Sequence, residues 1–538
     1  MKKIATNNLI LSVISGLLFS IGWTQMGIGW ITFFAFVPLL LIINNLQNSS
    51  KKNKGGWVLG FSYISFLIWN CISTYWVAYA TLPGAIAAIM LSALFMAGTI
   101  YFTFCCYNKF GKTVGNIAFV TNWLAFEYLF MNSQISWPWL VLGNSFANNI
   151  TLIQWYEYVG HLGGSAWILA VNILIFETYI WLINQNRKKI KIFGLSLLLL
   201  IFVPIISSLI LFYTHEEKGK DIDIVVIQPN IDPYNDKFGG MEEEEQLKII
   251  LGLCDSIGDN KVDYFVSPET ALCVFGIWEN DLQDEDCING VRNFLKKFPD
   301  AKFIIGAPTK RIYIDGYGKS ETASKYYDTE NYFDYFNTSL QIDTSENVCM
   351  YHKSRLVPGV EQLPYPKVFG FLQDLLLDLG GMTGSHGTQK NRSVFPNEKL
   401  DINVGVPICY ESIYGEFISE FVNAGANILF VITNDGWWHD TPGYRQHQSY
   451  SKIRAIETRK SIARSANTGI SCFINQRGEV VDKCGWWQRK AIRHKLKANS
   501  EITFYSKYGD FIARIALGIS ALLGLLMFAF WIKLKFSK

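Results

Sequence analysis

The chain has little charge for its length. Only 17% of its 538 residues are Asp, Glu, Lys or Arg, half are hydrophobic, and the mean hydropathy is +0.17. A composition this apolar excludes an ordinary water-soluble enzyme. The net charge is only +3, and no basic stripe runs along any segment, so we expect no nucleic-acid partner.

Charged residues are absent from particular stretches of the chain and frequent in others. Residues 5–50 and 55–108 contain no charged side chain, whereas residues 221–507 have the composition of a soluble α/β domain. Residues 511–532 are again strongly apolar. These shifts predict three parts: a seven-helix transmembrane domain over 1–220, a soluble domain over 221–507, and a C-terminal transmembrane helix within 508–538.

The apolar stretches are long enough for eight crossings, since about 20 apolar residues span the hydrocarbon core. Polar or Pro-Gly breaks at Thr24-Gln25 and Leu82-Pro83-Gly84 divide the uncharged stretches. The predicted crossings lie near Leu9–Trp23, Trp30–Asn45, Trp57–Ala80, Ala85–Tyr107, Val114–Met131, Ser165–Ile183, Ile192–Tyr213 and Phe511–Ile532.

Basic residues predict the orientation, because Lys and Arg in short loops stay cytoplasmic. Every second connection is basic, and the others are nearly uncharged. We therefore expect the soluble domain on the periplasmic side of a bacterial inner membrane. A cleaved signal peptide is disfavoured, because Phe19–Trp23 offers no small-residue cleavage site. The basic residues are Lys2, Lys3, Lys51, Lys52, Lys54, Lys109, Lys112, Arg187, Lys188, Lys189, Lys533, Lys535 and Lys538.

The ten cysteines show no metal-binding pattern, since no Cys-x-x-Cys or Cys/His spacing typical of zinc occurs. Three of them lie in predicted membrane helices, where they serve as packing residues. Seven lie in the soluble domain, and an odd number leaves at least one thiol unpaired within the chain. The sequence leaves the pairing open among Cys254, Cys273, Cys287, Cys349, Cys409, Cys472 and Cys484.

Short β-rich runs alternate with helical patterns in the soluble domain, which indicates a layered α/β fold. We expect strands over Ile222–Gln228, Asp263–Ser267, Lys302–Ala307, Ser339–Ile342, Val348–Lys353, Ile402–Ile408, Ile428–Thr433 and Gly469–Ile474. We expect helices over Met241–Ile257, Ile288–Phe298, Gly415–Ala424 and Tyr444–Ser465.

Three predicted strands lead into chemically reactive residues: Glu269, Lys353 and Cys409. A carboxylate can take a thiol proton, the thiolate can attack a carbonyl, and an ammonium can stabilise the oxyanion. Each residue alone also has an ordinary explanation. A Cys after a strand is commonly buried, a Glu after Pro often starts a helix, and a Lys at a strand end is commonly solvated.

The segments around these residues resemble the three active-site motifs of the nitrilase superfamily, in the family's order. They are Ser267–Thr270, Tyr351–Pro358 and Pro407–Ser412, followed by Thr433–Trp438, Arg454–Glu457 and Ala466–Ser471. The resemblance implies an αββα sandwich with Glu269 as general base, Lys353 as oxyanion stabiliser and Cys409 as nucleophile.

A multi-pass bundle around such a domain resembles one branch of that superfamily, the apolipoprotein N-acyltransferases. Trp137–Leu140 and Thr503–Asp510 are similar to further motifs of the branch. The resemblance implies a phospholipid as acyl donor, a diacylglyceryl apolipoprotein as acceptor, and a cysteine thioester between them. We expect no metal or other cofactor, and we expect a monomer in the lipid bilayer.

The resemblance also suggests supporting residues, namely Glu361, Tyr410, Glu411 and Asn434, and acyl-chain contacts, namely Trp139, Trp437 and Trp438. Two segments depart from the branch. Gly359-Val360 replaces the usual Phe-Gly before Glu361, and Trp437-Trp438-His439-Asp440 replaces Trp-Phe-Gly.

Two alternatives stay open. A membrane-tethered amidase of the same superfamily would pass the acyl group to water, although a tether needs far fewer than eight crossings. A transporter or scaffold with an inactive outer domain would have little reason to keep Glu269, Lys353 and Cys409 within their motifs.

Overall fold

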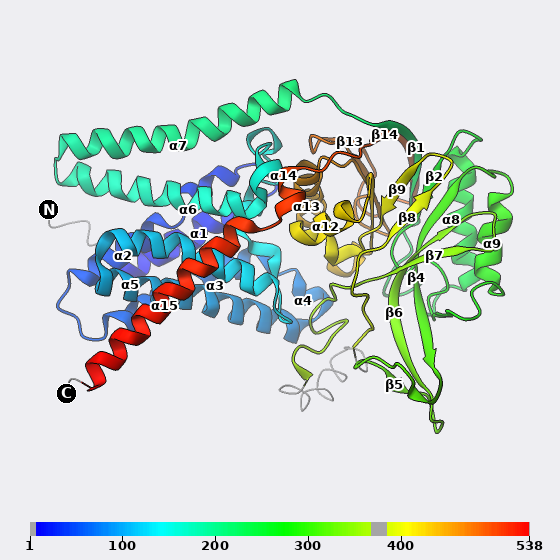
Figure 1. Cartoon of the computed structure of the whole chain (residues 1–538), viewed down its shortest axis with the longest axis horizontal. Coiled ribbons are helices and arrows are strands. Elements are labelled where there is room, and N and C mark those ends of the chain that lie inside the picture. Colours follow the sequence, from blue (N-terminus) through cyan, green and yellow to red (C-terminus); the bar gives the residue numbers. More distant parts are fainter. Residues whose placement is uncertain (1–6, 367–384, 537–538) are drawn as a thin grey trace. The chain divides into compact units, whose positions relative to one another are not determined.

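The computed structural model describes residues 7–366 and 385–536, and these form two compact units (Figure 1). One unit joins residues 1–78, 82–214 and 508–538, and we call it the helical unit. The other joins residues 79–81 and 215–507, and we call it the sandwich unit. Of the basic residues used above to predict orientation, Lys2, Lys3 and Lys538 lie outside the described residues.

The helical unit consists of long apolar helices joined by short 3₁₀ turns. Asn7 caps the first helix by accepting the backbone N–H of Leu9, and Asn53 caps α3 in the same way through Gly56. The helices are α1 (Asn8–Gly22), α2 (Val37–Gln47), α3 (Lys54–Thr74), α5 (Leu82–Met131), α6 (Tyr156–Ile183), α7 (Arg187–Thr214) and α15 (Phe511–Phe536). The short turns include η1 (Gly29–Phe34), η2 (Pro138–Leu140), η3 (Leu142–Phe146) and η4 (Ile150–Leu152).

Within the described residues, six helices are long and apolar enough to cross a membrane. They are Gly29–Gln47, which joins η1 to α2, together with α3, α5, α6, α7 and the first 23 residues of α15. Helix α5 has 50 residues, about 75 Å at 1.5 Å per residue, which is over twice the hydrocarbon thickness. Its backbone is non-helical at Gly111, where φ is 80°, so α5 consists of two arms. Helix α1 has only 15 residues.

The burial pattern of this unit is that of a membrane protein. A cluster of aromatic rings fills its centre, formed by Phe19, Phe36, Phe66, Trp69 and Trp123. By contrast, α7 buries only Ser208 and Phe212, and about half of its large apolar side chains are exposed. A helix that is apolar all round yet exposed in water would be unstable, so these faces meet lipid.

The sandwich unit is built on two β-sheets, as the resemblance to the nitrilase superfamily implied. The first sheet follows the order β14-β1-β2-β4-β6-β5, with β3 beside β4 and β7 beside β6, and the second follows β13-β12-β11-β10-β9-β8. Strands β1, β2 and β4 run parallel, as do β9, β10 and β11. The first sheet contains β1 (Lys220–Gln228), β2 (Tyr264–Val266), β3 (Ile277–Trp278), β4 (Lys302–Tyr313), β5 (Ser324–Lys325), β6 (Tyr332–Ile342), β7 (Val348–His352) and β14 (Lys490–Ala498). The second contains β8 (Val394–Asn397), β9 (Ile402–Gly405), β10 (Ile428–Thr433), β11 (Ile462–Ala466), β12 (Cys472–Ile474) and β13 (Val480–Lys483).

The two sheets pack face to face and helices cover their outer faces (Figure 1). The Ser465 hydroxyl donates to the Ile227 carbonyl across the interface at 2.7 Å, and the rings of Tyr264 and Phe430 meet edge to face. Helices α8 (Glu243–Ile257) and α9 (Asp286–Leu295) bury apolar side chains against the first sheet. Helices α12 (Gly415–Asn423) and α13 (Pro442–Thr458) belong to the helical layer on the second sheet. The result is an αββα sandwich.

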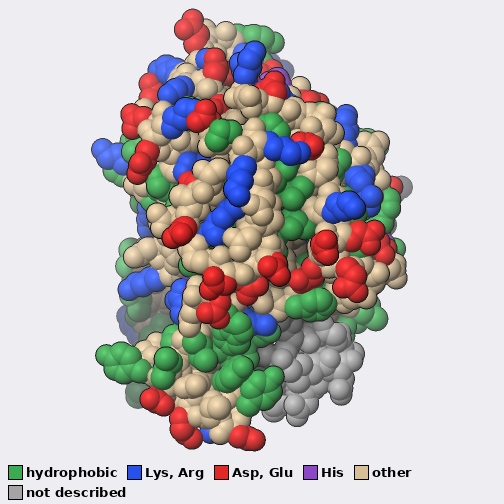
Figure 2. Space-filling view, turned by 90° about the vertical axis from the view of Figure 1, so that its right-hand side faces the viewer, with side chains coloured by type: hydrophobic (Ala, Val, Ile, Leu, Met, Phe, Trp, Pro, Cys, Tyr) green, Lys and Arg blue, Asp and Glu red, His purple; other side chains and the backbone are tan. Residues whose placement is uncertain are grey.

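The surface of the sandwich unit is that of a domain in water. Figure 2 shows side chains of both charges spread over one face, with acidic side chains gathered across its middle. The groove between α8 and α9, about 1030 Å³ in volume, is lined by Glu243, Glu244, Asp255, Asp284, Glu285 and Asp286, with Lys248 and Lys297. Such a surface differs sharply from the exposed apolar faces of α7.

Several element boundaries differ from the prediction: β4 runs on to Tyr313 and β6 begins at Tyr332, and two predicted helices end early. The expected helix over Tyr444–Ser465 ends at Thr458, because Arg459 adopts a left-handed conformation with φ of 51° and β11 begins at Ile462. The third predicted crossing ends at Thr74 instead of Ala80, and a separate turn of helix, α4 (Val77–Ala80), follows it.

Candidate active site

The carboxylate of Glu269 lies where β2 ends beside β4. The parallel pairing brings Gly306 of β4 against the Glu269 backbone, so closely that a Cβ at Gly306 would lie 2.6 Å from the Glu269 Cα. Only glycine fits there. Oε1 of Glu269 accepts from Lys353 Nζ at 3.0 Å and from Asn337 Nδ2 at 2.7 Å, while Oε2 accepts from the Asn434 backbone at 3.1 Å.

The ammonium of Lys353 is fully buried between two carboxylates. Its Nζ lies 3.0 Å from Glu269 Oε1 and 2.8 Å from Glu361 Oε1. Burial alone would lower the pKa of Lys353, but Glu269 and Glu361 outweigh it and hold this pKa well above its usual value. Among the residues that the structure describes, these two hydrogen bonds use two of its three N–H groups.

Gly359 and Val360, which replace the usual Phe-Gly of the related branch, do not move Glu361 away from Lys353. Glu361 Oε2 accepts from the Val357 backbone at 2.9 Å, while Gly359 takes a φ of 80° that suits glycine. Burial opposes ionisation of Glu361, but Lys353 lowers its pKa below the ordinary value. Glu361 is therefore a buried counter-charge to Lys353.

The nucleophile candidate Cys409 begins η7 (Cys409–Ile413), just past β9. Its backbone is left-handed, with φ of 50°, which is rare for a residue with a side chain and costs about 1–3 kcal/mol. Burial raises the pKa of the Cys409 thiol, Glu269 raises it further, and Lys353 opposes them. The thiol is therefore protonated at neutral pH, and its reaction needs a base.

Glu411 joins the lysine loop to the nucleophile. Its Oε1 accepts from the Ser354 backbone at 2.6 Å and from the Tyr351 hydroxyl at 2.7 Å, and its Oε2 accepts from the Ile408 backbone at 2.8 Å. Because Ser354 follows Lys353 and Ile408 precedes Cys409, this carboxylate sets the distance between the two loops. Tyr410 is buried beside Cys409, and its ring meets Tyr414 edge to face.

The segment after β10, residues 434–439, contacts Glu269 and several aromatic rings. The Asn434 backbone donates to Glu269, and its side-chain oxygen accepts from Asn467 at 3.2 Å. Trp437 lies against the rings of Tyr234 and Phe238, and Trp438 lies against His447. His439, in the second segment that departs from the related branch, stacks on Tyr234 with ring centroids 5.2 Å apart.

Trp139 belongs to the helical unit and is only 1% exposed. Its ring stacks on Trp137 and contacts Trp76, and its carbonyl accepts from the Trp23 indole. The structure therefore places Trp139 within the aromatic interior of the helical unit.

Sequence reasoning missed several buried polar residues that contact Glu269 and its neighbours. Asn337 of β6 donates to both Glu269 and Glu361, and Lys237 donates to the Glu269 carbonyl at 3.1 Å and to Thr270 Oγ1 at 2.9 Å. Burial lowers the pKa of Lys237 to about 8, against the attraction of Glu269. A lysine in the weakly patterned loop before α8 carries no sequence signal for this position.

A network of buried polar side chains at Cys409 was also not predicted from the sequence. His447 of α13 lies 3.1 Å from the Cys409 carbonyl, and Asp435 lies 2.9 Å from His447 Nδ1 and accepts from Arg464 of β11. A signal was present: α13 has few apolar residues, yet 14 of its 17 residues are buried. A buried polar helix must satisfy its polar groups internally.

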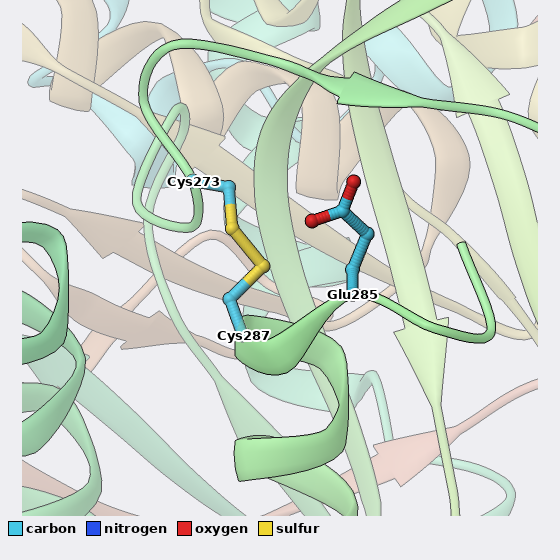
Figure 3. A group of neighbouring side chains, drawn as sticks. All are labelled: Cys273, Glu285 and Cys287. Atoms are coloured by element: carbon cyan, nitrogen blue, oxygen red, sulfur yellow. A yellow bond between two sulfur atoms is a disulfide. The ribbon is translucent and has the colours of Figure 1, made fainter. Parts of the chain in front are cut away.

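Two groups in the described residues have the composition of a metal site, but their contacts argue against one. Cys409, Asp435 and His447 bring ligand atoms within 4.8 Å of one another, but the Arg464 guanidinium already occupies Asp435. Figure 3 shows Cys273, Glu285 and Cys287, and the two sulfurs are bonded to each other. A disulfide offers no thiolate to a metal.

The Cys273–Cys287 disulfide resolves one question that the sequence left open. It links the loop after Glu269 to the start of α9, 14 residues later. Cys254, Cys349, Cys409, Cys472 and Cys484 are free thiols.

Comparisons with known proteins agree with the geometry. The family model described as carbon-nitrogen hydrolase matches residues 224–501, and that described as apolipoprotein N-acyltransferase N-terminal domain matches residues 15–174. The chain is 26% identical to the apolipoprotein N-acyltransferase of Chlorobaculum tepidum, over 98% of this chain and 97% of that one. It is 25% identical to that of Thermotoga maritima, over 94% and 90%.

Solved structures of the nitrilase superfamily are also similar. Saccharomyces cerevisiae Nit3 is 12% identical with a TM-score of 0.36, covering 53% of this chain and 92% of that one. A cysteine-to-alanine mutant of the Nesterenkonia AN1 amidase is 13% identical with a TM-score of 0.36, covering 55% and 97%.

Proposed function

Since this chain belongs to the apolipoprotein N-acyltransferase family of the nitrilase superfamily, and is thus an acyltransferase, we propose that it moves an acyl chain from a phospholipid to the α-amino group of a diacylglyceryl-cysteine. The donor and acceptor both keep their chains in a bilayer, which suits a catalyst attached to membrane helices. The observation that carries the proposal is the buried Glu269–Lys353–Glu361 cluster, of which the Glu269 and Lys353 charges act on the Cys409 thiol.

In the first half-reaction Glu269 takes the Cys409 proton while the sulfur bonds to the ester carbonyl carbon of the phospholipid. The third N–H of Lys353 and a backbone N–H after Cys409 hold the oxyanion. As the tetrahedral intermediate collapses, the C–O bond breaks and the lysophospholipid alkoxide takes the proton from Glu269. Cys409 is left as a thioester.

In the second half-reaction the amine of the lipoprotein's N-terminal cysteine attacks the thioester carbon. The C–S bond breaks, an amide forms, and the amine proton passes through Glu269 to the Cys409 thiolate. Glu361 keeps Lys353 charged and in place during both steps, while Glu411, Tyr410 and Asn434 position the loops that carry the reacting groups.

We propose that the sandwich unit lies on the periplasmic side of the inner membrane, held there by eight crossings. Eight result if α1 and both arms of α5 each span the bilayer. Lys109 and Lys112 flank the break at Gly111, which fits a cytoplasmic turn there. The Cys273–Cys287 disulfide supports an oxidising compartment.

The domain division we propose is 1–220 for the transmembrane helices, 221–507 for catalysis and 508–538 for the last helix. Trp437 and Trp438 are half-buried beside the site, and we propose them as contacts of the acyl chain. For Trp139 the same role stays a prediction, and a chain would reach this buried ring only if its aromatic neighbours moved.

The fate of the thioester separates the transferase from the amidase. A membrane-held amine is presented at high effective concentration, and a closed, oily site keeps water away. We expect the acylated enzyme to persist in buffer and to discharge only when a diacylglyceryl-cysteine peptide with a free N-terminus is added. The N-acetylated peptide is the matched control. Rapid hydrolysis in buffer, indifferent to either peptide, would favour the amidase and exclude the transferase.

A further inference from the structure

A network of fully buried side chains surrounds the backbone of the nucleophile. It consists of Thr433, Asp435, His447 and Arg464, none of which has exposed surface. Asp435 is its centre: it accepts from Thr433 Oγ1 at 2.7 Å and from Arg464 at 2.7 Å, and it lies 2.9 Å from His447 Nδ1. Burial opposes ionisation of Asp435, yet the Arg464 guanidinium lowers its pKa, so Asp435 is a charged partner to Arg464.

His447 connects this pair to Cys409. Its Nε2 lies 3.1 Å from the Cys409 carbonyl oxygen, and an N–H of Arg464 lies 3.0 Å from its Nδ1. Burial and Arg464 lower the pKa of His447, so the ring carries one proton at neutral pH. The Ser412 hydroxyl donates to the same carbonyl at 2.7 Å and lies 3.1 Å from Nε2, so Nε2 faces two oxygens that can accept a hydrogen bond. In the tautomer with the proton on Nε2, this nitrogen donates to the Cys409 carbonyl and Nδ1 accepts from Arg464.

The contact matters because Cys409 is held in a costly conformation. A left-handed residue with a side chain persists only when its surroundings over-determine it. A ring nitrogen of His447, a carboxylate oxygen of Asp435 and the Cys409 sulfur lie within 4.8 Å of one another. Because the carbonyl and the sulfur belong to the same residue, a shift of the carbonyl would move the thiol.

We propose that His447 is a positioning residue for the nucleophile: its Nε2–H holds the Cys409 carbonyl, and the Asp435–Arg464 pair holds its ring. The inference rests on the proposed function, since it gives His447 a part in the acylation of Cys409. His447 itself touches neither the ester nor the amine in this mechanism.

Two substitutions of His447 distinguish the roles of its two ring nitrogens. The amide nitrogen of glutamine reaches the place of Nε2, and that of asparagine reaches the place of Nδ1. We expect His447→Gln to form the acyl-enzyme within about threefold of the wild-type rate, and His447→Asn and His447→Ala to be about 100-fold slower, because a shift near 1 Å can cost that much. The KM for phospholipid in mixed micelles should not change. Ser449→Ala is the matched control, because Ser449 is buried on the same helix and its hydroxyl donates to the Gln446 carbonyl of that helix.

Alkylation of Cys409 by iodoacetamide gives a second readout that needs no lipid. The same order is expected: wild type, then His447→Gln, then His447→Asn. The proposal is overturned if asparagine matches or exceeds glutamine in both readouts, or if all variants react like wild type. Should His447→Ala fail to fold, the comparison of glutamine with asparagine still decides. If phospholipid does not acylate the wild type, the transferase proposal fails, while alkylation still tests His447.

Discussion

At the scale of single residues, the site is organised by the charge on one lysine. Lys353 has two carboxylate neighbours, so the cluster of three is negative before the thiol ionises. Burial and this cluster keep Cys409 protonated at rest, and in the proposed mechanism Glu269 takes its proton during attack. Removing one partner of a buried charge cluster leaves the others uncompensated, which is strongly destabilising.

Substitution of the nucleophile is the direct test of this scheme. We expect Cys409→Ala to abolish the acyl adduct in intact-mass spectra after incubation with phospholipid, because a nucleophile has no substitute. Cys254→Ala is the control, since Cys254 is also a buried free thiol but packs in the core between α8 and the first sheet. Appreciable turnover by Cys409→Ala would remove Cys409 from its role.

The Lys353–Glu361 pair predicts a pH dependence of stability. Because Lys353 lowers the pKa of Glu361, the ionised pair stabilises the fold above the ordinary carboxyl range, near pH 4. This contribution is lost as the pH falls through the lower folded-state pKa. We expect the wild type to melt higher than Glu361→Gln at pH 7 and the difference to close in acid. Glu244 is exposed, and Glu244→Gln should show no such convergence. A difference in melting temperature between wild type and Glu361→Gln that stays constant with pH would contradict the pairing.

At the scale of elements, the base is held by more than its strand. The loop after Glu269 is tied to Lys237 by hydrogen bonds, to Gly306 of β4 by close packing, and to α9 by the Cys273–Cys287 disulfide. Two residues in this loop, Thr270 and Cys273, have left-handed backbones. A loop with this strain needs such attachments to keep one conformation.

Removal of the disulfide tests the attachment. For a closed loop of this length, the cross-link contributes about 3 kcal/mol in the chain-entropy estimate. We expect the double substitution Cys273→Ser with Cys287→Ser to lower the melting temperature by several degrees and to slow acylation of Cys409. A reducing agent should reproduce the effect in wild type and leave the double variant unchanged. If reduction lowered both proteins equally, another thiol would be responsible.

At the scale of the whole molecule, the reaction requires the catalytic unit to meet lipids on one side of the bilayer. The basic residues predict that Lys51 is cytoplasmic and Asn260 periplasmic. Single cysteines at these positions, labelled in intact cells by a membrane-impermeant maleimide and compared with the unsubstituted chain, test the orientation. Asn260→Cys should react, and Lys51→Cys should react only after the membrane is opened. Finding both on the same side would overturn the count of seven crossings before the sandwich unit.

The sequence alone was sufficient for the division into apolar and soluble parts, for most strands and helices of the sandwich, and for Glu269, Lys353 and Cys409 as candidates. Hydrophobic length and period are local properties, and the motifs around the three residues are contiguous. Helix α13 was overextended, because the left-handed Arg459 that ends it has no marker such as glycine. Only the tertiary structure brought Lys237, Asn337 and His447 to the site and paired Cys273 with Cys287. Their contacts cross between elements far apart in the chain, and a hydrogen bond between distant segments leaves no periodic trace in the sequence.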